Sequence, residues 1–245
     1  MFKQSPQSLR AQYILGRLDR TAKTDRNPNA LTTALLYPIC TRDTVEALFR
    51  LPEFLAYGST RPGDPPNPRI PAPDLPKRFF RDLKPRVRRG LPIPWSDEDK
   101  PLPFLRYLFD LHHSRHMIAG PPKCDAHEGY ALTKAVAAGF VLLVKFLLDN
   151  HGDPGAKGSL AVMVAIHKRD LQMVKLLVEG VSGGSGGVKR RKVPDRVACT
   201  RAMLRRAVEA EAQDIIQYLL AKGVTPDIQT LGLLLLNGRL HSFRP

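Results

Sequence analysis

The sequence lacks several features that define common classes of protein. Its three cysteines, Cys40, Cys124 and Cys199, are far apart and odd in number, which argues against a disulfide framework and fits a reducing compartment. The longest apolar run, Phe140 to Leu148, is interrupted by Lys145 and is too short to span a bilayer. The first residues have no apolar core of a secretory signal. We therefore expect a soluble protein of the nucleus or cytoplasm.

Acidic residues are also scarce in this chain. The 23 Asp and Glu residues face 38 Lys and Arg residues, which gives a formal net charge of +15. Hydrophobic residues make up 43% of the sequence, enough for a folded core. A basic balance of this kind favours acidic partners, namely nucleic acid, an anionic membrane or an acidic protein surface, without choosing among them.

Recognisable catalytic and cofactor motifs are missing as well. The sequence contains neither the G-x-S-x-G of a nucleophile elbow nor the G-x-x-x-x-G-K-[ST] of a phosphate loop. The acidic cluster at Asp97, Glu98 and Asp99 is typical of a helix start. We therefore predict that the protein is not an enzyme and holds no cofactor.

One group of residues has the chemistry of zinc ligands but not the spacing. His112 and His116 are four residues apart on one helix face, and Cys124 and His127 follow. This spacing matches no common zinc module, and histidine is ordinary near a helix C-terminus, where it interacts favourably with the dipole. We predict no metal site.

Proline divides the chain. More than half of its prolines fall between Pro52 and Pro103, and proline both fixes φ and removes an amide donor. We expect a Pro-rich basic loop over 58–95, with a short helical turn near 79–83. On either side we expect an N-terminal helical segment over 1–57 and a helix with its connector over 96–128, each a possible divergent repeat. No alternating, strand-like run of useful length is present.

A six-residue pattern recurs along the chain. It reads VEALFR, LRYLFD, VKFLLD, VKLLVE and IQYLLA, starting at Val45, Leu105, Val144, Val174 and Ile216. Its first, fourth and fifth positions form one apolar stripe at helical spacing. Nine residues before each of the last three copies stands an alanine, and three before that an apolar residue: Ala135, Ala165 and Ala207, with Leu132, Val162 and Leu204. Each unit therefore predicts a helix, a tight turn and a second helix.

These units resemble ankyrin repeats. YALTKAVAAG at 130–139 is similar to the first helix and glycine turn of that family, and VKFLLDNHGDP at 144–154 to its second helix and exit turn. Thr133, Met163 and Arg205 replace the familiar histidine, and only Gly139 keeps the mid-repeat glycine, which Arg169 and Glu211 replace in the other copies. The resemblance implies an all-α stack over 129–245, ended by a capping helix that begins near Thr230.

The resemblance also implies where a partner binds. Ankyrin repeats bind through their hairpin tips and the surface of their first helices. In this chain those positions are Gly129, Tyr130, Lys134, Ala138, His167, Lys168, Arg201, Arg205 and Arg206. We therefore predict a non-catalytic protein-interaction module that binds an acidic protein surface, acts as a monomer and has no membrane partner.

Two basic clusters leave alternatives open. The first is KRFFRDLKPRVRR, with Lys77, Arg78, Phe79, Phe80, Arg81, Lys84, Arg86, Arg88 and Arg89 as candidate nucleic-acid contacts. Its two phenylalanines either stack on bases or anchor the loop to a core. The second is Lys189, Arg190, Arg191 and Lys192, which form either a nuclear-import signal or a solvated loop. An alternative function is therefore nucleic-acid binding through 77–89 and 189–196.

The second cluster lies in an insertion. Second-helix motifs at Val144 and Val174 are 30 residues apart, whereas those at Val174 and Ile216 are 42 apart. The extra residues of the longer spacing fall in the glycine-rich, basic stretch over 181–196. We therefore expect an exposed insertion in the turn between two repeats rather than a tether between domains.

Overall fold

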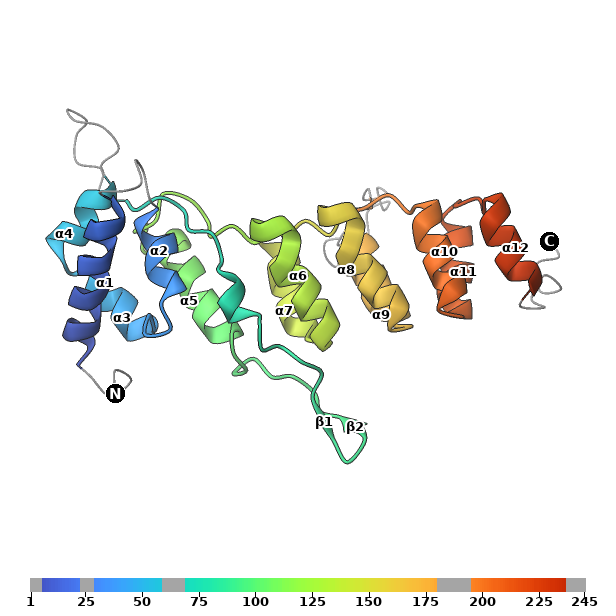
Figure 1. Cartoon of the computed structure of the whole chain (residues 1–245), viewed down its shortest axis with the longest axis horizontal. Helices are drawn as coiled ribbons and strands as arrows, with labels where there is room; N and C mark the ends of the chain where they lie inside the picture. The colour runs from blue at the N-terminus through green and yellow to red at the C-terminus, as the bar shows by residue number, and fades with distance from the viewer. Residues whose placement is uncertain (1–5, 23–28, 59–68, 180–194, 237–245) are drawn as a thin grey trace, which may run out of the picture. The chain divides into compact units, whose positions relative to one another are not determined.

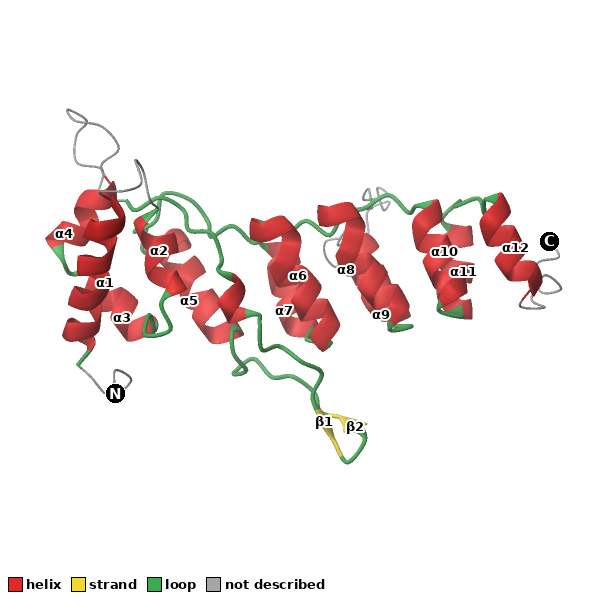
Figure 2. Ribbon diagram, in the orientation of Figure 1, coloured by secondary structure: helices red, strands yellow, loops and turns green. Residues whose placement is uncertain are grey.

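The computed structural model describes residues 6–22, 29–58, 69–179 and 195–236. The chain divides into two compact units, the first comprising 1–82 with 95–127 and the second comprising 83–94 with 128–245. In both units the described residues are mainly helical, with one short β-hairpin (Figures 1 and 2). No helix among the described residues is long and apolar enough to cross a membrane.

The first unit holds five α-helices among its described residues. They are α1 (Gln7–Ala22), α2 (Ala30–Leu36), α3 (Arg42–Phe49), α4 (Pro52–Leu55) and α5 (Leu102–His113). The first of them, α1, packs on α2 and α3 and buries Ala11, Ile14 and Leu18, a spacing that places these side chains on one face. The VEALFR and LRYLFD patterns lie on α3 and α5, as expected for amphipathic helices.

The Pro-rich segment of this unit is laid across the helices. Its backbone forms parallel bridges from Ile70 to Ile118 and from Asp74 to Lys123. The side-chain amide of Asn29 donates to the backbone carbonyl of Ala72 at 2.7 Å. Ile70, Leu75 and Phe80 are buried, alongside a 3-10 turn at Lys77–Phe79. That turn begins two residues before the helical turn that the sequence predicts.

The second unit consists of helix pairs that follow the repeat. The helices are α6 (Ala126–Ala138), α7 (Val141–Asp149), α8 (Ala156–His167), α9 (Leu171–Val178), α10 (Arg201–Glu209), α11 (Gln213–Ala221) and α12 (Ile228–Leu236). Val144, Val174 and Ile216 are all buried at equivalent places on α7, α9 and α11. The first helices also pack on one another, α8 against α10 and α10 against α12. The predicted all-α repeat stack is confirmed.

The same turn ends the first helix of all three pairs. Gly139, Arg169 and Glu211 have φ of +69°, +57° and +54°. Their amides donate to Val136, Ile166 and Val208, and the next amide in each turn donates to the carbonyl of Ala135, Ala165 or Ala207 at 3.0 to 3.1 Å. These paired bonds are a Schellman motif. The three alanines are fully buried, so the alanine repeat marks both a close helix crossing and a helix end.

The first helices of two pairs also begin alike. His127, Glu128 and Gly129 have positive φ, as do Lys157, Gly158 and Ser159, thirty residues later. At Gly129 the backbone comes so close to the next pair that an added Cβ would lie 2.8 Å from the Cβ of Ala156. Gly129 is therefore favoured by its backbone conformation and required by the spacing between repeats, whereas Ser159 occupies the equivalent position in the next pair.

The insertion after α9 falls largely on residues 180–194, outside the described residues. Its ends meet, because the amide of Arg196 donates to the carbonyl of Val178, the last residue of α9, at 2.7 Å. On the flanks, Glu179 accepts a hydrogen bond from the Tyr218 hydroxyl at 3.0 Å, and Asp195 accepts one from Lys222 at 2.8 Å. Helix α11 and the residue after it therefore hold both flanks of the insertion.

The second unit also contains a β-hairpin that the sequence did not indicate. Strands β1 (Val87–Arg88) and β2 (Leu91–Pro92) pair antiparallel through Arg88 and Leu91 and are the yellow arrows of Figure 2. Pro92 in one strand and an Arg-Gly turn obscure the usual pattern of strand residues flanking Asn-Gly.

Candidate functional site

The predicted partner-binding residues lie on α6, α8 and α10 or at their ends, and most reach the surface. Tyr130, Lys134, His167, Lys168, Arg201, Arg205 and Arg206 are half-exposed or exposed. Gly129 and Ala138 are exceptions that correct the prediction, because Gly129 is buried and Ala138 is only 3% exposed. Ala138 lies three residues after the fully buried Ala135, on the same face of α6, and therefore cannot contact a partner.

Several of these cations already have partners inside the repeats. The Lys168 ammonium donates to the carbonyl of Ala137 at 2.6 Å, which ties the end of α8 to the end of α6. Arg206 pairs with Glu209 at 3.2 Å, and Arg201 reaches the Thr225 hydroxyl at 3.4 Å. These contacts position the side chains, so the repeats present them in fixed places.

Arg205 has the most structural role among them. Its guanidinium pairs with Asp227 at 2.7 Å, and Asp227 also accepts bonds from the amide and the hydroxyl of Thr230, each at 2.7 Å. The two Thr230 bonds, followed by the Arg205 bond, hold the pKa of the Asp227 carboxyl well below its usual range. Asp227 thereby caps α12, and Arg205 joins that cap to α10.

Two functional candidates were missed by the sequence reasoning. Val164 occupies the position of Lys134 and Arg206 in the other pairs, thirty residues after one and forty-two before the other. The residue before it, Met163, occupies the position that Thr133 and Arg205 occupy in the other two pairs. Both are half-exposed on α8. The repeat alignment was the signal, since it places each position of one first helix beside the same position of the next.

We call the set Lys134, Met163, Val164, His167 and Arg206 the first-helix surface. It has apolar side chains on α8 in the middle pair, a cation on α6 on one side and a cation on α10 on the other. An apolar centre with a charged rim is the usual composition of a protein-binding surface.

The aromatic residues of the basic cluster over 77–89 pack within the first unit. Phe80 is 0% exposed, and the ring of Phe79 meets that of Phe104 on α5 edge-on at 5.3 Å. Arg78 donates through Nε to the carbonyl of Leu35 and through Nη2 to that of Cys40 at 3.3 Å. Phe80 offers no ring face to a base, and Arg78 caps the end of α2.

The other cations of that cluster are exposed. They are Lys77, Arg81, Lys84, Arg86, Arg88 and Arg89, of which the last four lie on or beside the β-hairpin. The structure therefore separates the cluster into a buried aromatic part and a solvent-facing basic part, which a linear sequence cannot distinguish.

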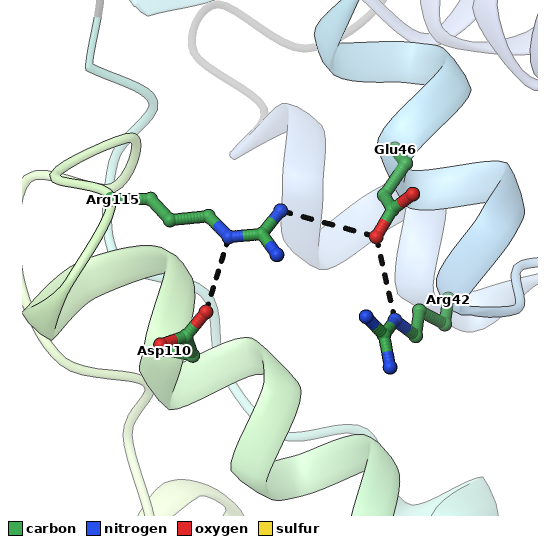
Figure 3. A network of polar contacts seen from close by, with 4 residues as sticks. All are labelled: Arg42, Glu46, Asp110 and Arg115. Atoms are coloured by element: carbon green, nitrogen blue, oxygen red, sulfur yellow. Dashed lines mark hydrogen bonds and ion pairs between the residues drawn. The ribbon is translucent and has the colours of Figure 1, made fainter.

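A network of charged side chains joins α3 to α5 in the first unit (Figure 3). Glu46 accepts from Arg42 at 3.3 Å and pairs with Arg115 at 3.9 Å, and Arg115 also meets Asp110 at 3.1 Å. The ring of Tyr107 lies beneath the Arg42 guanidinium at 4.9 Å and near that of Arg115 at 5.6 Å. Burial, and after it the Glu46 carboxylate, raises the pKa of Tyr107.

A cavity of about 150 Å³ adjoins this network. Its lining consists of Glu46, Phe49, Arg50, Tyr107, Leu111, Arg115 and Met117. Glu46 and Arg115 already satisfy each other, and the lining includes no cysteine, serine or histidine to act as nucleophile or base. Beside this cavity the Glu46–Arg115 pair connects α3 to the residues that follow α5.

The zinc-type residues are not gathered into a site. The His112 ring shares a hydrogen bond with the carbonyl of Ile118 at 3.1 Å, and Cys124 is buried, where burial raises the pKa of its thiol to about 12. Over the described ranges, no group of three or more His, Cys, Asp or Glu side chains is placed to hold a metal ion. The import-like run Lys189–Lys192 lies outside the described residues.

Residues 132–230 match the family model of ankyrin repeats, with three copies. This region of the chain consists of ankyrin repeats. The matched region runs from α6 into α12 and includes the three helix pairs described above. No curated protein and no solved structure matches the chain.

Membership of this family fixes the general role of the region. Ankyrin repeats are protein-interaction modules and are typically non-catalytic. In these repeats the mid-repeat turn keeps its left-handed conformation even where arginine or glutamate replaces glycine.

Proposed function

We propose that this ankyrin-repeat protein is a non-catalytic adaptor that binds an acidic protein partner through its first-helix surface. The observation that carries the proposal is the alignment of Lys134, Val164 and Arg206 at one position of three successive first helices. An apolar side chain between two cations fits a partner that sets an apolar side chain among carboxylates.

The net charge of +15 supports the same choice of partner. Long-range attraction between a basic protein and an acidic one accelerates their encounter and repels basic competitors. In this proposal the chain acts as a monomer, and it works in the nucleus or the cytoplasm. Sedimentation of the purified chain tests the first point, and imaging a fluorescent fusion with Lys189–Lys192 changed to alanine tests the role of that run in import.

The test uses two charge reversals in the same repeat. Lys134→Glu changes the first-helix surface, whereas Lys145→Glu makes the same change on the exposed face of α7. Partners captured by the full chain are purified, and their dissociation constants are measured against both variants. We expect Lys134→Glu to weaken binding at least tenfold and Lys145→Glu to have little effect, because the second substitution leaves the first-helix surface intact. Equal effects of the two reversals would contradict the proposal.

Nucleic acid is the competing partner, and exposed cations such as Lys84 and Arg88 favour it. Binding of the full chain to a generic DNA duplex at increasing salt decides between them. Affinity that falls steeply with salt would support phosphate contacts, whereas the protein-partner proposal expects no binding to duplex that survives physiological salt.

A further inference from the structure

The β-hairpin of the second unit presents a surface that the first-helix surface does not include. We propose that this hairpin, residues 84–93, is a second docking element, and that it binds an acidic protein segment carrying apolar side chains. The inference deepens the proposed function, on which it rests, by assigning part of the binding to a particular element.

The hairpin is a defined structure and not merely a loop. Arg88 and Leu91 are paired across a two-residue turn in which Arg89 and Gly90 have φ of +52° and +80°. Positive φ at both central residues is what a type I′ turn requires, and that turn matches the twist of the strands. The amide of Ile93 donates to the carbonyl of Arg86 at 2.9 Å. The side chains are therefore held in a fixed order before any partner arrives.

Apolar side chains on this hairpin face solvent to an unusual degree. Val87 is 59% exposed, Leu91 71% and Ile93 39%. Lys84, Arg86, Arg88 and Arg89 are exposed as well, and residues 83–94 include no Asp or Glu. Exposed apolar side chains that lie together within a polar rim have the composition of an interaction surface.

The pairing places these residues on particular faces. Because cross-strand partners share a face and alternate residues return to it, Arg86, Arg88, Leu91 and Ile93 lie on one side. Val87 lies on the other. One face therefore sets the guanidinium groups of Arg86 and Arg88 beside the aliphatic side chains of Ile93 and Leu91 across the hairpin, which is complementary to a segment that carries both carboxylates and apolar residues.

Two other classes of ligand fit this surface less well. Phosphate groups alone would engage the cations and leave the aliphatic side chains in water, and the aromatic residues that could stack on bases, Phe79 and Phe80, pack inside the first unit. A bilayer would receive the tip of the hairpin first, but two of the four tip residues, Arg88, Arg89, Gly90 and Leu91, are arginines, and guanidinium groups are costly to bury in hydrocarbon.

Binding by strand addition is also disfavoured at the β2 side. Pro92 and Pro94 have no amide hydrogen, so that side of the hairpin offers few donors to an added strand. On that side recognition must come from side chains, those of Arg86, Arg88, Leu91 and Ile93.

The experiment uses the full chain and four labelled probes, with binding measured by fluorescence anisotropy or co-sedimentation. The first probe is a synthetic peptide that alternates Glu or Asp with Leu and Phe, and the second replaces its apolar residues with Ser. The third is a generic DNA duplex, and the fourth is vesicles of phosphatidylcholine and phosphatidylserine at a ratio of about 3 to 1.

The test variant is Leu91→Ser combined with Ile93→Ser, and Val141→Ser is the control because Val141 is an exposed aliphatic residue on α7. We expect the first peptide to bind more tightly than the second, and the test variant to weaken that binding about tenfold. The control variant should bind like the unmodified chain, and all variants should melt at the same temperature. Equal binding of both peptides, or no effect of the test variant, would overturn the inference. DNA or vesicle binding that the test variant abolishes would overturn it too, in favour of that ligand.

Failure here is separable from failure of the proposed function. A partner whose affinity falls with Lys134→Glu but not with the hairpin variant removes the hairpin and keeps the first-helix surface. A partner that responds to the hairpin variant alone assigns all of the binding to the hairpin and removes the proposed role of the first-helix surface.

Discussion

Arg169 and Glu211 occupy the same turn position in successive repeats and form an ion pair with an N···O distance of 4.0 Å. Both have left-handed backbone conformations, with φ of +57° and +54°, which glycine adopts without strain and other residues do not. Their side chains are 59% and 52% exposed, and an ion pair so exposed contributes little to stability. The repeat geometry therefore holds these two residues in place against their own conformational preference.

The substitution Arg169→Gly should consequently stabilise the protein. Removing the left-handed strain is expected to gain about 1 kcal/mol, more than the exposed ion pair contributes. Urea unfolding of the full chain measures the change. Arg169→Ala is the matched control, because it removes the ion pair and keeps the strain, and it should show no gain. A loss of stability on Arg169→Gly would mean that the ion pair outweighs the strain.

A loss of stability is expected where a glycine with positive φ is replaced, as at Gly139 in the mid-repeat turn and at Gly129 near the start of α6. Gly129→Ala introduces both a left-handed alanine and a Cβ 2.8 Å from that of Ala156, whereas at Gly139 an added Cβ meets nothing within 4 Å and only the backbone strain remains. We expect Gly139→Ala to cost about 1 kcal/mol of unfolding free energy and Gly129→Ala about 2 to 4 kcal/mol. Thermal and urea unfolding of the two variants compare these costs. Similar losses would show that the repeats can move apart at Gly129.

The burial of Phe80 gives a third prediction. Its side chain is 0% exposed, so Phe80→Ala should destabilise the first unit by about 3 to 5 kcal/mol. Arg81→Ala, at the next residue, which is exposed, should leave stability unchanged. If the two variants unfold at the same denaturant concentration, the Pro-rich segment is not anchored through Phe80.

Buried thiols predict a loss of stability in alkali. Burial raises the pKa of Cys40 and of Cys124 from 9.0 to about 12. The unfolded chain therefore loses these protons first, so the stabilisation that they provide is complete below pH 9.0 and disappears as the pH rises towards 12. Each thiol should lower the unfolding free energy by about 1.4 kcal/mol per pH unit in that window.

Unfolding measured at a series of pH values from neutral to strongly alkaline tests this slope. The double variant Cys40→Ala and Cys124→Ala should show a shallower decline than the unmodified chain. Cys199→Ala is the comparison, because Cys199 is only half-buried and burial raises the pKa of its thiol less, so this variant should reduce the decline less than the double variant does. An unchanged slope in the double variant would assign the alkaline loss to tyrosines such as Tyr218, whose pKa is raised by burial and by its hydrogen bond to Glu179.

Sequence reasoning missed the hairpin, and it gave α1 no bounds of its own within the helical segment that it expected over 1–57. Among its described side chains helix α1 buries Ala11, Ile14 and Leu18, a sparse stripe that is stabilised by packing against α3. The hairpin combines Pro92 with an Arg-Gly turn, and neither matches the residues that usually predict paired strands.

The sequence by itself determined the repeat. The spacing of Leu132, Ala135 and Val144, and of their counterparts, defines helix pairs through the helical period alone, because a buried stripe is a local property. Only the tertiary structure decided which surface residues are available. In the folded chain Ala138 is buried, whereas Val87 and Leu91 are exposed to solvent. Arg78 and Arg205 interact with helix ends and their caps. These outcomes depend on neighbours distant in the sequence, and a local pattern contains no information about such neighbours.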